Sequence, residues 1–289
     1  MPAYAYRLVN VFAETFFGGN PLCVFEDARG MSDALMQDLA RQFNLSETTF
    51  LLPADQADAQ VRIYTPGYEM RFAGHPTLGS AHVVRALRGG DALTLVFKAG
   101  RVAVRAVGER WTFTAPTQGD PRTAAPALPA AEIAAQLGLE ADDLLEDPLW
   151  VDTGADQLLV PLKTPEAVRR ATPDSTRLEG WQPSSLGRRT AYVFAFGDMA
   201  DDGRRTVHAR YFFSKEGGGV AEDPGTGSAC ANLGGWLLAR GHALPARIVV
   251  RQGEQVQRPC ALYLDVDVQG AIHVGGRVVQ VGVGVVELP

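Results

Sequence analysis

Two octets in the chain carry residue types that could hold a small acid. One reads EDPGTGSA at residues 222–229, and the other reads GHPTLGSA at residues 74–81. When the prolines of the two octets are aligned, the Gly-Ser-Ala that ends each octet also coincides, without a gap. This is an internal repeat, and it predicts a chain of two related halves.

The proline in each octet indicates a helix N-terminus, because its fixed φ and missing N–H suit the first turn of a helix. The small residues that follow leave backbone N–H groups uncovered, and these donors bind carboxylates at the positive end of the helix dipole. A phosphate loop is the competing interpretation, but neither octet has the Gly-Lys-Ser/Thr ending of a Walker loop. Two such helix starts facing one cleft could therefore grip a small acid.

The elements that must position these octets are mostly strands. Apolar and β-branched runs bounded by turn residues predict strands at residues 6–12, 22–25, 45–53, 61–64, 93–97, 101–107, 111–115, 157–162, 191–196, 207–213, 248–251, 261–266, 272–274 and 278–286. Helices are expected from Ser32 or Asp33 as cap to about Asn44, at 77–87, 130–137 and 165–171, and from the second octet to Gly241 as C′ residue. The helix at 77–87 has few polar residues, so sheet should cover most of its sides.

Each half thus has antiparallel strands around one apolar helix. A parallel doubly wound fold would need strands that alternate regularly with helices, and this pattern is missing. Four prolines in residues 116–129 mark the expected linker. The fold class predicted is α+β with two similar lobes.

Composition narrows the classes of function. A chain of 289 residues with 46% hydrophobic and 21% charged residues has the balance of a folded globular protein, and its net charge of −6 argues against nucleic acid as a partner. The first residues do not resemble a signal peptide, and no apolar run reaches the ~18 residues of a membrane-spanning helix. We therefore expect a cytoplasmic protein with no membrane partner.

The cysteines and histidines give no support for a metal site. Cys23, Cys230 and Cys260 show no C-x-x-C spacing and are expected to be buried thiols in a reducing compartment. The five histidines show no H-E-x-x-H or comparable spacing, so no metal is expected. His82 is expected to be a core or surface residue.

Four motifs in order resemble those of the PhzF-like phenazine biosynthesis isomerase family, and the match covers nearly the whole chain. They are VNVF at 9–12 with GNP at 19–21, LSETTF at 45–50, FAGHPT at 72–77 and EDPGTGSA at 222–229. One departure is Gly225, where alanine is usual in the family; glycine is small enough to change little.

The resemblance implies the diaminopimelate epimerase-like fold, in which two lobes, each an antiparallel curled sheet around a central helix, have the active site between them. The family's last strands return to the first lobe. This implies an N-terminal lobe of residues 1–118 plus 276–289 and a C-terminal lobe of residues 119–275. The resemblance further implies a homodimer, no cofactor and a small carboxylate-bearing substrate. The family's best-studied activity isomerises a dihydro-hydroxyanthranilate by moving a proton.

Glu47 stands at the position of the family's acid and base. A cofactor-free isomerase must take a proton from carbon and return it elsewhere, so it needs a group that holds a proton near neutral pH. Burial beside apolar groups raises a carboxyl pKa into that range, and Leu45, Phe50 and Leu51 flank Glu47 in the sequence. The alternative is a solvated glutamate at a strand start, and the motif match decides against it.

The other site residues come from the two octets. His75 could donate a hydrogen bond or a proton to substrate, or pair with a backbone carbonyl. Asp223 could orient a substrate amine or hydroxyl, or cap its helix. Gly227 and Ser228 are expected to give donors to a carboxylate from one side, and Gly74 and Thr77 from the other. Asn20 is expected to be a turn residue.

Two rival functions remain open. Related epimerases and racemases use two opposed cysteines, whose positions fall here at Ala73 and Pro224, and neither residue can carry a proton. Cys230 lies six residues beyond Pro224 and does not replace the missing thiol. An amino-acid epimerase or racemase that uses one base or an acidic pair is one rival. A non-catalytic protein that binds small acids is the other.

Overall fold

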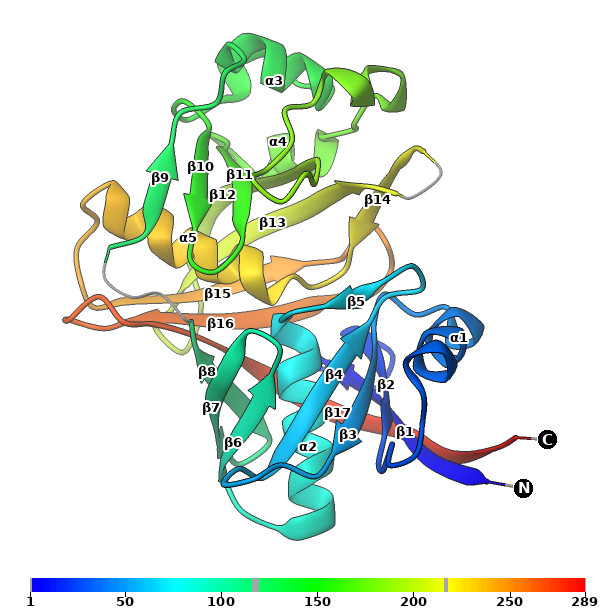
Figure 1. Ribbon diagram of the computed structural model, residues 1–289. Coiled ribbons are helices and arrows are strands. Elements are labelled where there is room, and N and C mark those ends of the chain that lie inside the picture. Colours follow the sequence, from blue (N-terminus) through cyan, green and yellow to red (C-terminus); the bar gives the residue numbers. More distant parts are fainter. Residues whose placement is uncertain (1, 116–119, 216–217, 289) are drawn as a thin grey trace. The chain divides into compact units, whose positions relative to one another are not determined.

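A mixture of sheet and a few helices builds the chain in the computed structural model, which describes residues 2–115, 120–215 and 218–288 (Figure 1). The chain divides into two compact units, Met1–Thr114 with Gly275–Pro289 and Ala115–Val274. We call them unit 1 and unit 2. The first predicted lobe boundary, between residues 118 and 119, lies outside the described residues. The second predicted boundary lies between residues 275 and 276, whereas the units divide between Val274 and Gly275.

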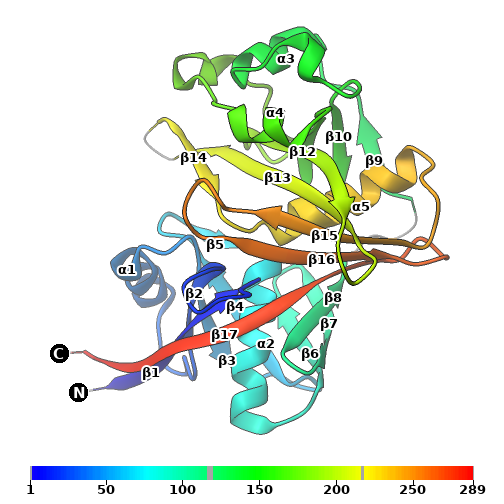
Figure 2. The same cartoon turned by 180° about the vertical axis from the view of Figure 1, so that it is seen from behind.

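Unit 1 holds one sheet with two helices. Its elements are β1 (Ala3–Val11), β2 (Asn20–Phe25), α1 (Asp33–Phe43), β3 (Thr48–Leu52), β4 (Ala59–Tyr64), β5 (Glu69–Met70), α2 (Gly74–Arg88), β6 (Ala92–Phe97), β7 (Gly100–Val107), β8 (Arg110–Thr114) and the part of β17 (Ile272–Glu287) from Gly275 onward. The strands pair in the order β8-β7-β6-β4-β3-β2-β1-β17. Figure 2 shows β1 and β17 side by side, with both termini at the same end of the pair.

Unit 2 repeats this plan. Its elements are β9 (Arg122–Ala124), α3 (Ala130–Gln136), a 3-10 helix (Ala141–Asp143), β10 (Leu149–Asp152), β11 (Asp156–Pro161), α4 (Pro165–Arg170), a second 3-10 helix (Ser175–Gly180), β12 (Thr190–Met199), β13 (Arg205–Ser214), β14 (Val220–Asp223), α5 (Gly227–Ala239), β15 (Ala246–Gln252) and β16 (Cys260–Val266). The strands pair in the order β16-β15-β13-β12-β11-β10-β9.

The two orders match strand for strand once β8 is set aside, and so do the strand directions. In unit 1 the pairs β2/β3 and β4/β6 are parallel, and in unit 2 the matching pairs β11/β12 and β13/β15 are parallel. A parallel pair needs a crossover, and α1, α2, α4 and α5 lie in the four crossovers. The α+β class is therefore confirmed, but the prediction of wholly antiparallel sheets is wrong.

Local signals gave several ends correctly. Ser32 caps α1 by accepting a hydrogen bond from the Leu35 N–H, and Asn44 ends the helix in the left-handed conformation. Gly241 follows the C-cap of α5 with φ of 68°. The predicted strands at 272–274 and 278–286 are one strand, β17, and the short strands β5, β9, β10 and β14 were not predicted.

Helix α2 is enclosed by sheet, as its apolar composition predicts. It contacts β1, β2, β3, β4, β6 and β8. Gly79 makes this close approach possible, because a Cβ at that position would lie 2.5 Å from Leu22 Cδ2 and 3.0 Å from Val11 Cγ2. The helix start that carries His75 is therefore held rigidly against the sheet of unit 1.

Candidate active site

Glu47 and His75 face each other in unit 1. Glu47 is the residue before β3, and His75 is the second residue of α2. The His75 Nε2 and Glu47 Oε2 atoms are 3.5 Å apart, and the two side chains are 5% and 15% exposed. This separation is long for a hydrogen bond but within the range of an ion pair. The solvated-glutamate alternative does not hold for a side chain so enclosed.

Two polar contacts hold the two chain segments that carry this pair. The Ser46 hydroxyl donates to Asn20 Oδ1 at 3.3 Å, which ties the residue beside Glu47 to the start of β2. The Ser80 hydroxyl donates to Thr49 Oγ1 at 3.0 Å, which ties α2 to β3. Asn20 is fully buried and opens a strand, so the expectation of a simple turn residue is wrong.

The start of α2 differs from its prediction. The helix begins at Gly74, three residues earlier than expected, with Ala73 as an extended N-cap and Pro76 inside the first turn. Pro76 is tolerated there because the first N–H groups of a helix have no partner within it. The Thr77 hydroxyl donates to the Ala73 carbonyl at 2.7 Å, so its proton is used within the helix. Gly74 and Thr77 are both buried.

Asp223 ends strand β14 in unit 2, and hydrogen bonds from Thr226 and Gln252 hold it in place. The Gln252 side-chain N–H donates to Thr226 Oγ1 at 3.1 Å and to the Asp223 carbonyl at 2.8 Å, and the Thr226 hydroxyl donates to Asp223 Oδ2 at 2.5 Å. Thr226, not Asp223, is the N-cap of α5. The helix-cap alternative for Asp223 is thus wrong, and so is the prediction that Pro224 lies in the first turn.

Gly253 lets the chain pass close to this turn. Its φ is 83°, and a Cβ there would lie 2.5 Å from the Pro224 carbonyl oxygen and 2.3 Å from the Arg258 carbonyl oxygen. Only glycine adopts this conformation at so little steric cost. The position of the 223–226 turn therefore depends on a glycine in the following strand connection.

Ser228, the second residue of α5, accepts a hydrogen bond from the buried side chain of Gln157. The Gln157 side-chain N–H donates to Ser228 Oγ at 2.9 Å and to the Tyr211 hydroxyl at 3.3 Å. Burial raises the pKa of Tyr211 well above its ordinary value, so that phenol keeps its proton. Gly227 is buried at the first position of the same helix.

Each unit also clamps the strand before its octet with an arginine. In unit 2, Arg210 holds Glu222 with two hydrogen bonds of 3.1 and 2.7 Å, and it donates to the Arg169 carbonyl near the end of α4. In unit 1, Arg62 holds Glu69 with bonds of 2.8 and 2.7 Å. Glu222 is therefore a structural member of its octet.

Sequence reasoning missed Gln157, Asn232, Gln252 and the role of Thr226. Asn232 left the clearest signal, because it is the polar residue in the middle of the apolar helix α5, and a buried amide needs hydrogen-bond partners. Gln157 and Gln252 stand at the ends of apolar strand runs. Their partners come from distant segments, which a single sequence does not reveal.

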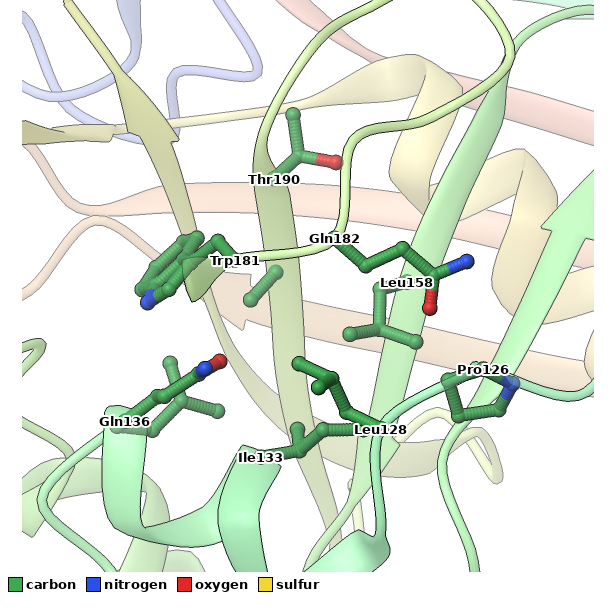
Figure 3. A pocket seen from close by; sticks show the side chains of 10 residues that line it. Pro126, Leu128, Ile133, Gln136, Leu158, Trp181, Gln182 and Thr190 are labelled. Carbon is green, nitrogen blue, oxygen red and sulfur yellow. The ribbon is translucent and has the colours of Figure 1, made fainter. Parts of the chain in front are cut away.

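The apolar pocket drawn in Figure 3 is a different feature of unit 2. It is lined mainly by Leu128, Ile133, Leu158 and Trp181, with Gln182 at its edge. Its volume of about 10 Å³ leaves room for about one water molecule and none for a ring compound. None of the predicted site residues lines it.

Among the described residues, no group of three or more His, Cys, Asp and Glu side chains is arranged to hold a metal ion. The described helices also include none that is long and apolar enough to cross a membrane.

Burial lowers the pKa of His82, and the positive charges of Arg85 and Arg7 lower that pKa further.

Comparisons with known proteins assign the family. The sequence model of the phenazine biosynthesis-like proteins matches residues 9–284. The chain belongs to this family. It is 39% identical to an uncharacterised isomerase of Pasteurella multocida over 289 residues, which cover 99% of this chain and 95% of the relative. It is 32% identical to the trans-2,3-dihydro-3-hydroxyanthranilate isomerase of Pseudomonas aeruginosa over 289 residues, which cover 95% and 96% of the two chains.

A solved structure supports the fold as well. The PhzF-family phenazine biosynthesis protein of Bacillus anthracis aligns with a TM-score of 0.84 and 24% identity, over 100% of both chains. The resemblance inferred from the motifs is confirmed, and so is the diaminopimelate epimerase-like fold class. Like its named relatives, this family member is an isomerase.

Proposed function

We propose that this PhzF-like protein moves a proton between two carbons of a small carboxylate substrate, without a cofactor, and that Glu47 carries the proton. The observation that supports Glu47 is its enclosed pairing with His75, at 3.5 Å in unit 1. A carboxylate removed from water holds a proton more readily than an exposed one. It can therefore act as base in the first half of the reaction and as acid in the second.

The proposed reaction conserves all atoms of the substrate. Glu47 takes a proton from one substrate carbon, and the electron pair of the broken C–H bond becomes part of a new double bond. The electron pair of an existing double bond then forms a C–H bond with the returned proton at another carbon. Because substrate and product are isomers, no oxidant or reductant is required.

The remaining residues are proposed to position the substrate. His75 donates a hydrogen bond beside Glu47, and the Asp223 carboxylate orients a substrate amine or hydroxyl. Ser228 and the backbone N–H groups near Gly227 bind the carboxylate, with Gly74 as the corresponding residue of unit 1. Thr77, which was predicted to join it, uses both its hydroxyl and its N–H to donate to the Ala73 carbonyl within α2. That one substrate meets both sets of residues remains a prediction from the family resemblance.

The test begins with trans-2,3-dihydro-3-hydroxyanthranilate, the compound in the name of the Pseudomonas aeruginosa relative, and extends to other small unsaturated carboxylates. Replacing Glu47 by Gln removes the proton carrier and keeps the side-chain shape. We expect turnover of the accepted substrate to fall at least about 10³-fold, while its affinity stays within about threefold. Undiminished turnover by Glu47→Gln would remove Glu47 from the mechanism.

The rival epimerase reaction inverts one carbon and moves no double bond. Ala73 and Pro224 at the two cysteine positions of the related racemases count against the two-thiol form of that reaction. Product analysis in deuterated water separates the alternatives, because migration places deuterium on a different carbon from the one that lost its proton. A non-catalytic binding protein would bind the same acids and incorporate no deuterium.

We also propose that the protein is a homodimer, which the family resemblance implies. Val281, Val283 and Val285 on β17 are 37%, 70% and 58% exposed and alternate along one face. A row of exposed valines on a strand is a common means of pairing with a second copy. Light scattering during size exclusion should give twice the chain mass, and Val283→Asp should yield the monomer. The cytoplasmic location stays a prediction that cell fractionation tests.

A further inference from the structure

We infer that Gln157 and Asn232 are positioning residues that hold the Ser228 hydroxyl in one direction, so that its proton is offered to the substrate carboxylate. This inference rests on the proposed role of Ser228 in substrate binding. Three side chains form the relay, in the order Asn232, Gln157 and Ser228, and all belong to unit 2.

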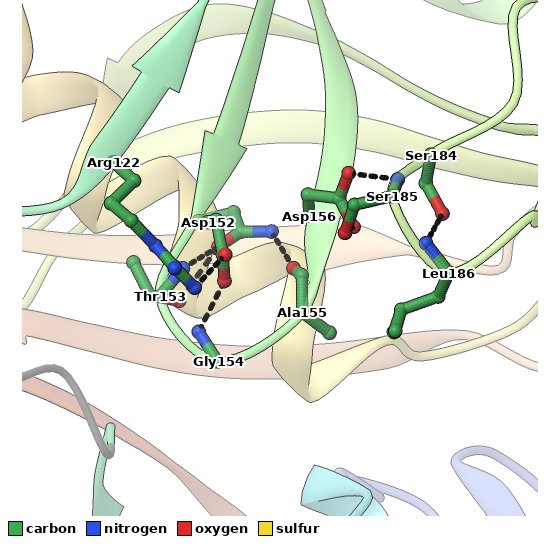
Figure 4. A network of polar contacts seen from close by, with 10 residues as sticks. Arg122, Asp152, Thr153, Gly154, Ala155, Asp156, Ser184, Ser185 and Leu186 are labelled. Atoms are coloured by element: carbon green, nitrogen blue, oxygen red, sulfur yellow. Dashed lines mark hydrogen bonds and ion pairs between the residues drawn. The ribbon is translucent and has the colours of Figure 1, made fainter.

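The amide of Asn232 is fixed by two backbone groups that have no choice of role. The Thr153 N–H can only donate, and it donates to Asn232 Oδ1 at 2.9 Å. The Ala155 carbonyl can only accept, and it accepts from Asn232 Nδ2 at 2.8 Å. Figure 4 shows Thr153 and Ala155 in the turn between β10 and β11, with these bonds dashed. The oxygen and nitrogen of Asn232 are therefore assigned without ambiguity.

The orientation of Gln157 follows from that of Asn232. The second N–H of Asn232 Nδ2 donates to Gln157 Oε1 at 2.9 Å, so this atom must be the oxygen. The nitrogen of Gln157 then faces Ser228 and Tyr211, and it donates to Ser228 Oγ at 2.9 Å. An amide nitrogen has no acceptor capacity, so the Ser228 hydroxyl cannot turn its proton toward Gln157.

The proton of Ser228 is consequently directed away from the relay. Within the described part of the chain, Ser228 Oγ makes no hydrogen bond other than the one it accepts from Gln157. Ser228 is half-buried, whereas Asn232 is fully buried and Gln157 is 5% exposed. Because the Ser228 hydroxyl accepts a hydrogen bond from a fixed donor, it can use its own proton to donate to a ligand. It also becomes a stronger donor, since linked hydrogen bonds polarise one another.

Packing keeps the relay from relaxing. A Cβ on Gly235 would lie 2.8 Å from Thr153 Cγ2 and 2.9 Å from Val151 Cγ1, so α5 lies directly on the end of β10. The Thr153 hydroxyl adds a second bond to Asn232 Oδ1, at 2.6 Å. The hydroxyl direction is thus set before a ligand arrives, which lowers the entropy lost on binding.

The experiment compares Gln157→Glu, Ser228→Ala and the double variant. A carboxylate at position 157 still accepts from Asn232, but it also accepts from Ser228 and turns the hydroxyl proton inward. We expect Gln157→Glu to weaken binding about ten- to hundredfold, the usual size of a lost hydrogen bond to a charged group. The probe is 3-hydroxyanthranilate, the aromatic analogue of the relatives' named substrate, measured by calorimetry. With a turned-over substrate, KM should rise and kcat should change little.

The double variant decides whether Gln157 acts through Ser228. In the Ser228→Ala background, Gln157→Glu should weaken binding by no more than about threefold, because the two residues act as one unit. Equal effects of Gln157→Glu in both backgrounds would overturn the relay. Gln136→Glu is the matched control, since Gln136 is also a buried glutamine of unit 2 and donates to the Gly180 carbonyl. It should leave the affinity unchanged.

Two further measurements cover variants that fold poorly and a probe that does not bind. Gln157→Met removes the donor without adding charge, and it should weaken binding about threefold with a native melting profile. In ¹⁵N-labelled protein, Ser228→Ala should shift the side-chain amide resonances of Gln157 and not those of Gln136. If the probe fails to bind, the proposed substrate class fails, but this resonance still decides the relay. An unshifted Gln157 resonance would contradict it.

Discussion

Helices α2 and α5 occupy corresponding places in the two units but begin differently. Their octets align without a gap, and the strand orders around them are the same, yet the helices begin at different aligned positions. Helix α2 begins at the first residue of its octet, Gly74, whereas α5 begins at the sixth, Gly227. The five residues that are helical in unit 1 are strand and turn in unit 2.

This shift gives the two units different chemistry. In unit 1 the early helix start buries His75 beside Glu47 and commits the Thr77 hydroxyl to a helix carbonyl. In unit 2 the late start leaves Asp223 at a strand end and frees the Thr226 hydroxyl to hold its carboxylate. One unit thus presents a pair suited to proton transfer, and the other a carboxylate and a hydroxyl suited to orientation. The two units share their strand order, and the different helix starts are what give them the different roles proposed here.

The largest expected difference lies in the two arginine clamps. Glu222 and Arg210 are 8% and 11% exposed, and Glu222→Gln leaves the Arg210 charge buried without its carboxylate. We expect a loss of about 3–5 kcal/mol in the free energy of unfolding. Glu69→Gln should cost less, about 1–2 kcal/mol, because Arg62 keeps its ion pair with Asp33. Urea unfolding of both variants makes the comparison, and equal losses would contradict it.

The glycine beside the Asp223 turn should come next. Gly253→Ala places a Cβ against two carbonyl oxygens at a positive φ, so we expect a loss of about 2–3 kcal/mol together with weaker substrate binding. Gly241→Ala is the matched control. It has a positive φ of 68° but open space around its Cβ, and it should cost about 1 kcal/mol with no effect on binding. A binding defect in Gly241→Ala would remove the assigned role of Gly253.

The two helix-start threonines should respond differently to the same change. Thr226→Val removes the hydrogen bond to the Asp223 carboxylate, and we expect kcat/KM to fall about tenfold with a small loss of stability. Thr77→Val removes a bond inside α2, so we expect about 1 kcal/mol of stability to be lost and a smaller kinetic change. Steady-state kinetics and thermal melts of both variants check this. A larger kinetic defect in Thr77→Val would reverse the assignment.

The smallest expected effect is a change in acid stability of unit 1. Although burial opposes it, hydrogen bonds from Arg62 and Lys98 lower the pKa of Glu69. A lowered folded-state pKa contributes stability that is complete above the ordinary glutamate pKa, about 4.3, and is lost as the pH falls through the folded-state pKa. Glu69→Gln should therefore flatten the decline of stability below about pH 4. An unchanged decline would show that other carboxyls dominate it.

Local signals and the repeat were enough to predict much of the fold. Two of these signals, the Ser32 cap and the Asn44 terminus, depend on residues only a few positions away in the chain. The burial of α2 follows from its apolar composition, whichever strands cover it. The parallel strand pairs could not be predicted, because strand direction depends on which distant strands meet. The four-residue strand β14 was not predicted for the same reason. It depends on pairing with β13 and on the contact between Arg210 and Glu222, and its own sequence indicates neither.

The site followed the same division. Motifs mark Glu47, His75, Asp223 and Ser228 as the predicted site residues, and the burial of Glu47 agrees with its apolar neighbours in sequence. The amides of Gln157 and Gln252 lie far in the sequence from the residues to which they donate, Ser228 for one and Thr226 with the Asp223 carbonyl for the other. Their roles depend on the direction of individual hydrogen bonds, which only coordinates provide.

The most direct test of the account is hydrogen exchange between solvent and the reacting carbon of an accepted substrate. The experiment compares the wild type with Glu47→Gln in deuterated water, at substrate concentrations that saturate both proteins. We expect deuterium in the substrate or product of the wild type and none above background with Glu47→Gln, although that variant still binds. Exchange at the wild-type rate in Glu47→Gln would contradict it.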